Sequence, residues 1–184
     1  DRSATVYTRL AKQAYPDLPV ILGGLEASLR RFAHYDYWDD AVRPSILLDS
    51  QADLLLYGMG EKVITQLTQR LRHGEALETI RDLRGCCYLC RQEEIPQDSV
   101  SCASFHKVSE NKESYAKAHQ IQTEWQDAET WEWVDTRTTE EMPAIRPLMS
   151  EFALRDAEGD ATEEILTAPG RVYMLCVTSF DLFF

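Results

Sequence analysis

Two short apolar runs near the start of the chain each end at a glycine turn that is followed by a carboxylate. The runs occupy residues 20–22 and 54–56, and the glycines after them are Gly23, Gly24, Gly58 and Gly60. About thirty residues separate the runs, which is long enough for the crossover between two parallel strands. Ligands of open α/β sheets bind outside the carboxyl ends of such strands. The layout therefore predicts a ligand-binding edge.

The side chains next to these turns are of the kinds that hold small ligands. The candidate cofactor-binding residues are Gly23, Gly24, Glu26, Ser28, Arg30, Arg31, His34, Gly58, Gly60 and Glu61. The two arginines have the donor geometry to hold a substrate or cofactor carboxylate with paired hydrogen bonds. No residue of this chain is predicted to be catalytic or to ligate a metal.

Structural explanations exist for the same residues. Glycine is needed wherever a turn requires a positive φ, and a glutamate in the first turn of a helix, such as Glu26 or Glu61, favours the helix dipole. The two arginines can form surface ion pairs with the aspartates of the run DYWDD, and the aromatic residues around His34 are typical of a domain interface.

The remaining patterns predict helices on both sides of a sheet. We expect helices over residues 3–14, 25–32, 61–72, 76–83 and 108–125, a helical turn over 45–49, and a third strand over 86–89. In the first ninety or so residues, strands alternate with helices, which predicts an α/β fold with an open, mostly parallel sheet. From Asp127 to Gly170 the chain is acidic and interrupted by prolines, and there we expect partial order at best.

The net charge of −12 comes entirely from the second half of the chain. Residues 1–92 carry twelve acidic and twelve basic side chains, whereas residues 93–165 carry eighteen acidic and six basic. We therefore expect an α/β domain over 1–92, a polar helix or linker over 93–127, and an acidic tail over 128–184. Acidic surfaces repel phosphate backbones, so nucleic acid is not an expected partner.

Two other features of the sequence bear on its location. The longest apolar tract, near the C-terminus, is too short to span a membrane and is interrupted by Asp181, so no membrane contact is expected. The five cysteines give no even disulfide framework. We therefore expect a cytoplasmic protein.

The block GGLEASLRRFAHYDYWDD, followed by RPSILLDSQADLLLYGMGE, closely resembles the N-terminal domain of the YgiQ-type radical SAM proteins. A weaker likeness extends over residues 1–127, including the segment VSENKESYAKAHQIQTEWQD. The resemblance implies a cobalamin-binding-like, Rossmann-like fold, incomplete here. Cobalamin itself is not expected, because none of the four histidines lies in the pattern Asp-x-His-x-x-Gly. For the full-length protein the resemblance implies a 4Fe-4S cluster and S-adenosylmethionine.

The cysteine motif of radical SAM chemistry is absent. It needs three thiolates spaced Cys-x-x-x-Cys-x-x-Cys, but Glu93 stands where the third cysteine after Cys86 and Cys90 would be. Three alternatives remain: a buried strand whose cysteines act as small hydrophobic residues, a cluster completed by Cys102, and a zinc site formed by Cys87, Cys90, Cys102 and His106. The first is favoured, so we expect this chain alone to bind no cofactor.

We therefore expect an accessory domain whose partner is the radical SAM barrel of the same parent polypeptide. A second hypothesis is a stand-alone α/β module that binds a small anionic or nucleotide-like ligand at the two glycine turns. A third is an interaction protein that uses its acidic second half.

Overall fold

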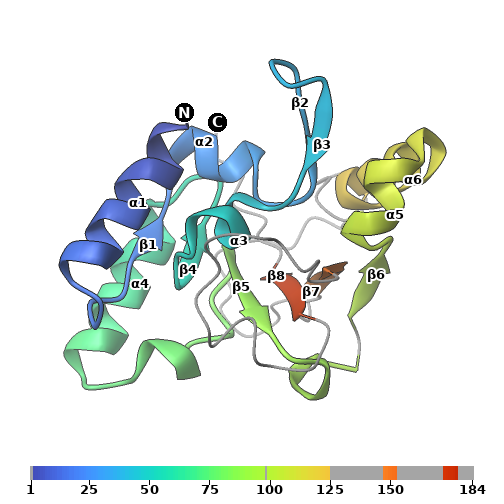
Figure 1. Ribbon diagram of the computed structural model, residues 1–184. Helices are drawn as coiled ribbons and strands as arrows, with labels where there is room; N and C mark the ends of the chain where they lie inside the picture. Colours follow the sequence, from blue (N-terminus) through green and yellow to red (C-terminus); the bar gives the residue numbers. More distant parts are fainter. Residues whose placement is uncertain (1, 98, 125–146, 153–171, 178–184) are drawn as a thin grey trace.

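The structure is a computed structural model that describes residues 2–97, 99–124, 147–152 and 172–177 (Figure 1). It is a mixed α/β fold with one larger sheet and a separate two-stranded hairpin. The helices are α1 (Ser3–Ala14), α2 (Gly24–Leu29), α3 (Ile46–Ser50), α4 (Glu61–Arg72), α5 (Phe105–Glu110) and α6 (Lys112–Glu124). The strands are β1 (Ile21–Leu22), β2 (His34–Asp36), β3 (Ala41–Arg43), β4 (Leu54–Leu56), β5 (Cys86–Cys90), β6 (Val100–Cys102), β7 (Pro147–Phe152) and β8 (Val172–Val177).

The six-stranded sheet has the order β1-β4-β5-β8-β7-β6. Strands β1 and β4 are parallel, with Ile21 opposite Leu54 and Leu22 opposite Leu55, as the sequence predicted. Strands β6 and β7 are also parallel, but the other three adjacent pairs are antiparallel. The sheet is therefore mixed: the parallel pairing of the first two predicted strands is confirmed, whereas the third predicted strand, β5, runs antiparallel to its neighbours. The cobalamin-binding-like, Rossmann-like fold is not confirmed and stays a prediction.

The direction of β5 follows from how the chain returns after α4. A parallel β5 would need a single crossover, but the chain reverses at Gly74 and runs back along the helix. Arg70 lies against this returning segment, and its guanidinium forms ion pairs with Glu75 and, at 2.5 Å, with Asp82. The N–H of Tyr57 then donates to the carbonyl of Gly85 at 2.8 Å. Strand β5 thus begins beside the end of β4, which makes the pair antiparallel.

Buried side chains pack on both faces of β4. Leu55 belongs to one core cluster with Ile46 and Leu47 of α3, whereas Leu54 and Leu56 belong to another with Val63 and Leu67 of α4. Successive residues of a strand point to opposite faces, so a continuous leucine run is what a strand covered by helices on both sides requires.

Several predicted helix boundaries are confirmed. Helix α4 spans the predicted residues 61–72, and the side chain of Ser45 accepts a hydrogen bond from the N–H of Leu47 at the start of α3. The predicted helix over 76–83 is wrong, because only the single turn Leu77–Thr79 is helical there.

The single long helix predicted over 108–125 is divided into α5 and α6. At Asn111 the backbone is extended, and the Asn111 side chain accepts a hydrogen bond from the N–H of Ser114 at 2.9 Å. Asparagine favours such caps over helix interiors, which explains the break. Ser104 caps α5, because its side chain accepts a hydrogen bond from the N–H of Lys107. Trp125 lies outside the described residues.

The hairpin of β2 and β3 was not predicted. His34 lies opposite Arg43, and Asp36 lies opposite Ala41. Figure 1 shows the hairpin projecting away from the sheet, between α2 and the pair α5 and α6.

Candidate functional site

The two glycine turns lie at the same edge of the sheet, because β1 and β4 are parallel and each turn follows the carboxyl end of its strand. Gly24 has a φ of +84° and Gly58 a φ of +73°, a region that side chains disfavour. The carbonyl oxygen of Leu56 is the heavy atom nearest to where a Cβ on Gly23 would lie, at 3.9 Å. These glycines therefore shape the edge through their backbone.

Ser28 connects the two turns. Its hydroxyl donates to the carbonyl of Gly24 at 2.8 Å and accepts from the N–H of Gly58 at 3.1 Å. The predicted site residues Gly24, Ser28 and Gly58 are thus brought together by hydrogen bonds. In this arrangement the Ser28 hydroxyl holds the two turns in register.

Arg30 pairs with a glutamate of its own helix rather than with the aspartates of DYWDD, which corrects the ion-pair explanation given above for this arginine. Arg30 forms an ion pair with Glu26 at 2.9 Å, one helical turn away. The Arg31 guanidinium lies 4.8 Å from the centroid of the Tyr57 ring and 5.5 Å from that of Phe32. It also donates to the carbonyl of Ser28, and burial lowers the pKa of Arg31. The Arg31 guanidinium is therefore a cation packed against aromatic rings next to the turn at Gly58.

Gly60 and Glu61 form the start of α4. No side chain caps this end, and Glu61 is exposed in the first turn. The edge thus presents the turn at Gly58 and the first turn of a twelve-residue helix to solvent. Binding at these residues stays a prediction.

His34 lies in the hairpin rather than at the strand ends. Its ring Nδ1 is 3.2 Å from the carbonyl oxygen of Phe32, and the ring is half-buried. Burial lowers the pKa of His34; the Phe32 carbonyl opposes the shift, and the positive charges of Arg30, Arg2 and Arg43 add to it. The neutral imidazole is therefore favoured.

The sequence did not predict that the carboxylate of Asp36, at the base of the hairpin, is buried. The Asp36 side chain is 1% exposed and accepts a hydrogen bond from the N–H of Trp38 at 2.9 Å. It forms ion pairs with Arg2, just before α1, and with Arg43 on β3, whose Nε is 3.7 Å away. The same two arginines pair with Asp39, and these hydrogen bonds lower the pKa of Asp39. We call Arg2, Asp36, Asp39 and Arg43 the hairpin ion cluster.

Three aromatic residues of the hairpin are exposed: Tyr35 by 51%, Tyr37 by 76% and Trp38 by 86%. The Tyr37 and Trp38 rings meet edge to face, with centroids 5.5 Å apart. The Tyr35 hydroxyl donates to Asp40 at 2.5 Å, and this hydrogen bond raises the pKa of Tyr35. Exposed rings of this kind fit the domain-interface explanation of these residues.

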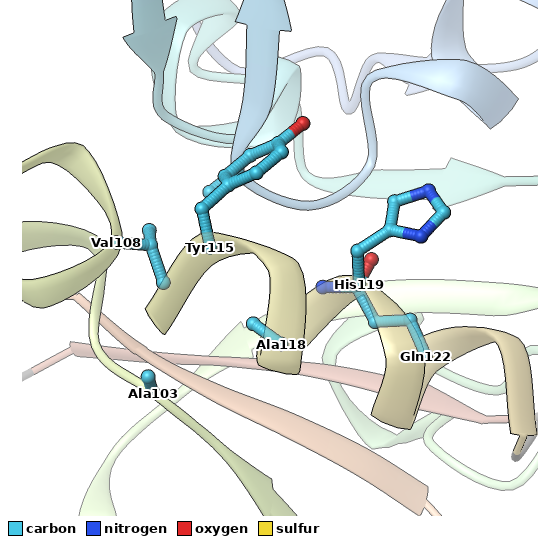
Figure 2. Close-up of a pocket in the computed structure, with 7 residues that line it drawn as sticks. Ala103, Val108, Tyr115, Ala118, His119 and Gln122 are labelled. Carbon is cyan, nitrogen blue, oxygen red and sulfur yellow. The ribbon is translucent and has the colours of Figure 1, made fainter. Parts of the chain in front are cut away.

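A small hollow lies at the base of the hairpin against α5 and α6 (Figure 2). It is lined by Ala33, Ala103, Val108, Tyr115, Ala118, His119 and Gln122. In Figure 2 the Tyr115 ring extends from α6 toward the hairpin, and its hydroxyl accepts the N–H of Tyr35 at 3.1 Å. Through this hydrogen bond Tyr115 ties the hairpin to α6.

The cysteines of GCCYLC do not fit a four-iron cluster. Strand alternation places Cys86 and Cys90 in one core cluster and Cys87 in the other, so the Cys-x-x-Cys pair faces opposite sides of the sheet. Burial raises the pKa of Cys86 to about 12 and that of Cys90 to about 11, which disfavours the thiolates that iron requires. Cys87 is disulfide-bonded.

The other potential metal ligands fit no better. Burial raises the pKa of Cys102 to about 11. Within the described ranges, no group of three or more histidine, cysteine, aspartate or glutamate side chains is arranged to hold a metal ion. In the same ranges, no helix is both long enough and apolar enough to cross a membrane.

These features define an α/β domain with glycine turns at one sheet edge and an exposed aromatic hairpin beside it. The sequence profile of the radical SAM N-terminal family matches residues 1–161. The chain belongs to this family, and the resemblance found in the sequence is confirmed.

The relatives are much longer than this chain. A UPF0313 protein of Clostridium botulinum strain 657 is 52% identical over 128 residues, which cover 70% of this chain and 20% of the relative. A UPF0313 protein of Thermotoga maritima is 44% identical over 155 residues, covering 82% of this chain and 27% of the relative. The chain thus spans about a fifth to a quarter of these relatives. No solved structure matches it.

Proposed function

We propose that this chain is the N-terminal accessory domain of a radical SAM iron–sulfur protein and does not catalyse a reaction alone. Its partner is the radical SAM barrel of the same parent polypeptide. In that protein the 4Fe-4S cluster would bind S-adenosylmethionine and cleave it reductively. The present chain would shape or cover the active site without supplying cluster ligands.

The placement of GCCYLC within β5 carries this proposal. Cys86 and Cys90 are the cysteines with the first interval of the cluster motif, but both are buried in the core behind α4. The Sγ of Cys86 donates to the carbonyl of Leu83 at 2.9 Å. Freeing these thiols for iron would open the core between β5 and the helix. Their arrangement therefore favours a structural role, and cluster ligands are expected elsewhere in the parent polypeptide.

Anaerobic reconstitution with iron and sulfide tests the proposal. The 184-residue chain and the full-length Thermotoga maritima relative are treated in parallel, and visible absorption and S-adenosylmethionine cleavage are measured. We expect both signals from the relative and neither from this chain. The double variant Cys86→Ala/Cys90→Ala is the control. A cluster on this chain that disappears in the control would contradict the proposal, and so would a relative that binds no cluster.

The geometry of the two glycine turns favours a second function, which is the binding of a small ligand. Ser28 holds the two turns together, and the uncapped first turn of α4 offers backbone N–H groups beside Gly58. Such a helix start suits a small anionic or nucleotide-like ligand. Calorimetric titration with ATP, S-adenosylmethionine and inorganic phosphate tests this function. Binding that is lost in Gly58→Val, but kept in the exposed control Gly74→Val, would support the stand-alone module.

Two further expectations belong to this proposal. We retain the division into an α/β domain over 1–92, a polar segment over 93–127 and an acidic tail over 128–184. Limited proteolysis tests it, because cleavage should concentrate after residue 92. A cytoplasmic location is also retained.

A further inference from the structure

We propose that the β2–β3 hairpin is the surface on which this domain docks the rest of its parent polypeptide, and that Asp36 fixes the orientation of the hairpin. The inference rests on the proposed function and adds to it the surface and the positioning residue. The occupant to which we commit is the part of the polypeptide that lies outside this chain, which amounts to about three quarters or more of the relatives' length.

The exposure of the aromatic rings is the first reason. Tyr37 and Trp38 are 76% and 86% exposed although their rings pack against each other. Large aromatic side chains are enriched in the buried centres of interfaces and depleted from free surfaces. A pair left in solvent on a projecting element is therefore suited to burial by a partner.

The hairpin has no role in the core of this domain. Among the described residues, neither core cluster contains a residue of β2, β3 or the turn between them. A two-stranded hairpin is at best marginally stable by itself. Its fold therefore has to be maintained by contacts at its base, and these contacts serve a purpose other than core packing.

Those contacts hold the hairpin rigidly from two sides. On one side Asp36 is clamped between Arg2 and Arg43, and it also accepts the N–H of Trp38. On the other side the Tyr115 hydroxyl of α6 accepts the N–H of Tyr35. Fixing side chains before association lowers the entropy lost on binding. Asp36, which touches the backbone of Trp38 directly, is the positioning residue.

The charged groups of the hairpin indicate what kind of surface can bind it. Asp39 is neutralised by Arg2 and Arg43, and the remaining carboxylate of the turn, Asp40, accepts the Tyr35 hydroxyl. The hairpin therefore presents two aromatic rings with one carboxylate beside them. We infer that its partner is an apolar surface with a basic side chain at the rim, opposite Asp40.

Hydroxyl-radical footprinting compares the surface in two proteins. One is the 184-residue chain, and the other is a chimera in which this chain replaces the matched segment of the full-length Thermotoga maritima relative. Mass spectrometry measures oxidation at Tyr37 and Trp38, and at Tyr7 of α1 as a reference, because Tyr7 is similarly exposed at 72%. We expect at least fivefold less oxidation of Tyr37 and Trp38 in the chimera, with Tyr7 changed less than twofold.

The outcomes separate the inference from the proposed function. Protection of other residues in the chimera, with Tyr37 and Trp38 still oxidised, would overturn the hairpin as the docking surface and leave the accessory role standing. No protection at any residue would overturn both. Tyr37 and Trp38 of the isolated chain could instead become protected as its concentration rises, with no further protection in the chimera. That result would mean that a second copy of the chain covers the hairpin, and it would also overturn the inference.

Variants test the positioning role of Asp36. In the chimera, Tyr37→Ser/Trp38→Ser should loosen the domain, seen as at least tenfold faster proteolytic release, whereas Tyr7→Ser should not. Asp36→Ala removes both the ion pairs and the acceptor of the Trp38 N–H, so it should restore oxidation at Trp38 in the chimera while core amides keep their hydrogen-exchange protection. Asp39→Asn should leave Trp38 protected. Equal oxidation of Trp38 in the Asp36 and Asp39 variants would refute a positioning role for Asp36.

Discussion

Replacing Asp36 by asparagine tests how much the hairpin ion cluster stabilises the domain. Asparagine keeps the shape of the side chain and can still accept the N–H of Trp38, so the variant removes mainly the charge. The Asp36 carboxylate is 1% exposed, whereas Arg2 is 23% and Arg43 is 36% exposed. Removing one partner of a fully buried pair costs about 3–5 kcal/mol. Because both arginines reach solvent, we expect a loss below that range, about 2–3 kcal/mol.

For a chain of this length, each kcal/mol lowers the melting temperature by roughly 2–4 °C, so a loss of about 5–10 °C is expected. Circular dichroism measures the transition at low and high salt. The control is Asp39→Asn, because Asp39 pairs with the same arginines but its side chain is 43% exposed. We expect its melting temperature to stay close to that of the unmodified chain. If the two variants melt together, the burial of Asp36 does not decide the strength of the cluster.

Three other predictions concern single groups. Ser28→Ala should lose about 1 kcal/mol and speed hydrogen exchange at the Gly58 amide, and unchanged exchange would mean that the bridge between the turns is unimportant. Because folding lowers the pKa of His34, the stability it contributes is present above the ordinary value of 6.5 and is lost as the pH falls below it. His34→Gln should flatten that loss, and a pH profile identical to the unmodified chain would contradict the prediction. Cys86 and Cys90 should react with iodoacetamide at pH 8 only as fast as the chain unfolds, and rapid alkylation of the folded chain would contradict their burial.

Local sequence patterns predicted the parts of the fold that depend on neighbouring residues. The helix over 61–72 follows from hydrophobic spacing. The parallel pairing of the two apolar runs follows from the glycine turn at the end of each run. The direction of β5 depends instead on the return of the chain along α4 to the end of β4, which a count of alternating strands and helices does not contain. Strands of three residues, such as those of the hairpin, are also too short to show a period.

The candidate site was predictable to a similar extent. Glycine turns predicted which backbone segments meet, and the structure places Ser28 between them. Burial could not be predicted for Asp36, because it lies among polar and aromatic residues that resemble a solvent-exposed loop. Its partner Arg2 is more than thirty positions away along the chain. Long-range charge pairing leaves no periodic signal in a single sequence.

The position of β8 has a consequence for how the protein is made. Strand β8 lies between β5 and β7, so the strand latest in the sequence among those described joins the two halves of the sheet. During synthesis, β5 leaves the ribosome well before β8, and β7 leaves it before β8 as well, because β7 ends at Phe152 and β8 begins at Val172. The nascent chain must keep both edges apart until residue 177 is available, although exposed edges readily pair with each other or with another chain. Premature pairing of β5 with β7 would trap the domain in the wrong strand order, so ribosome pausing or a chaperone at this stage would have a direct effect on yield.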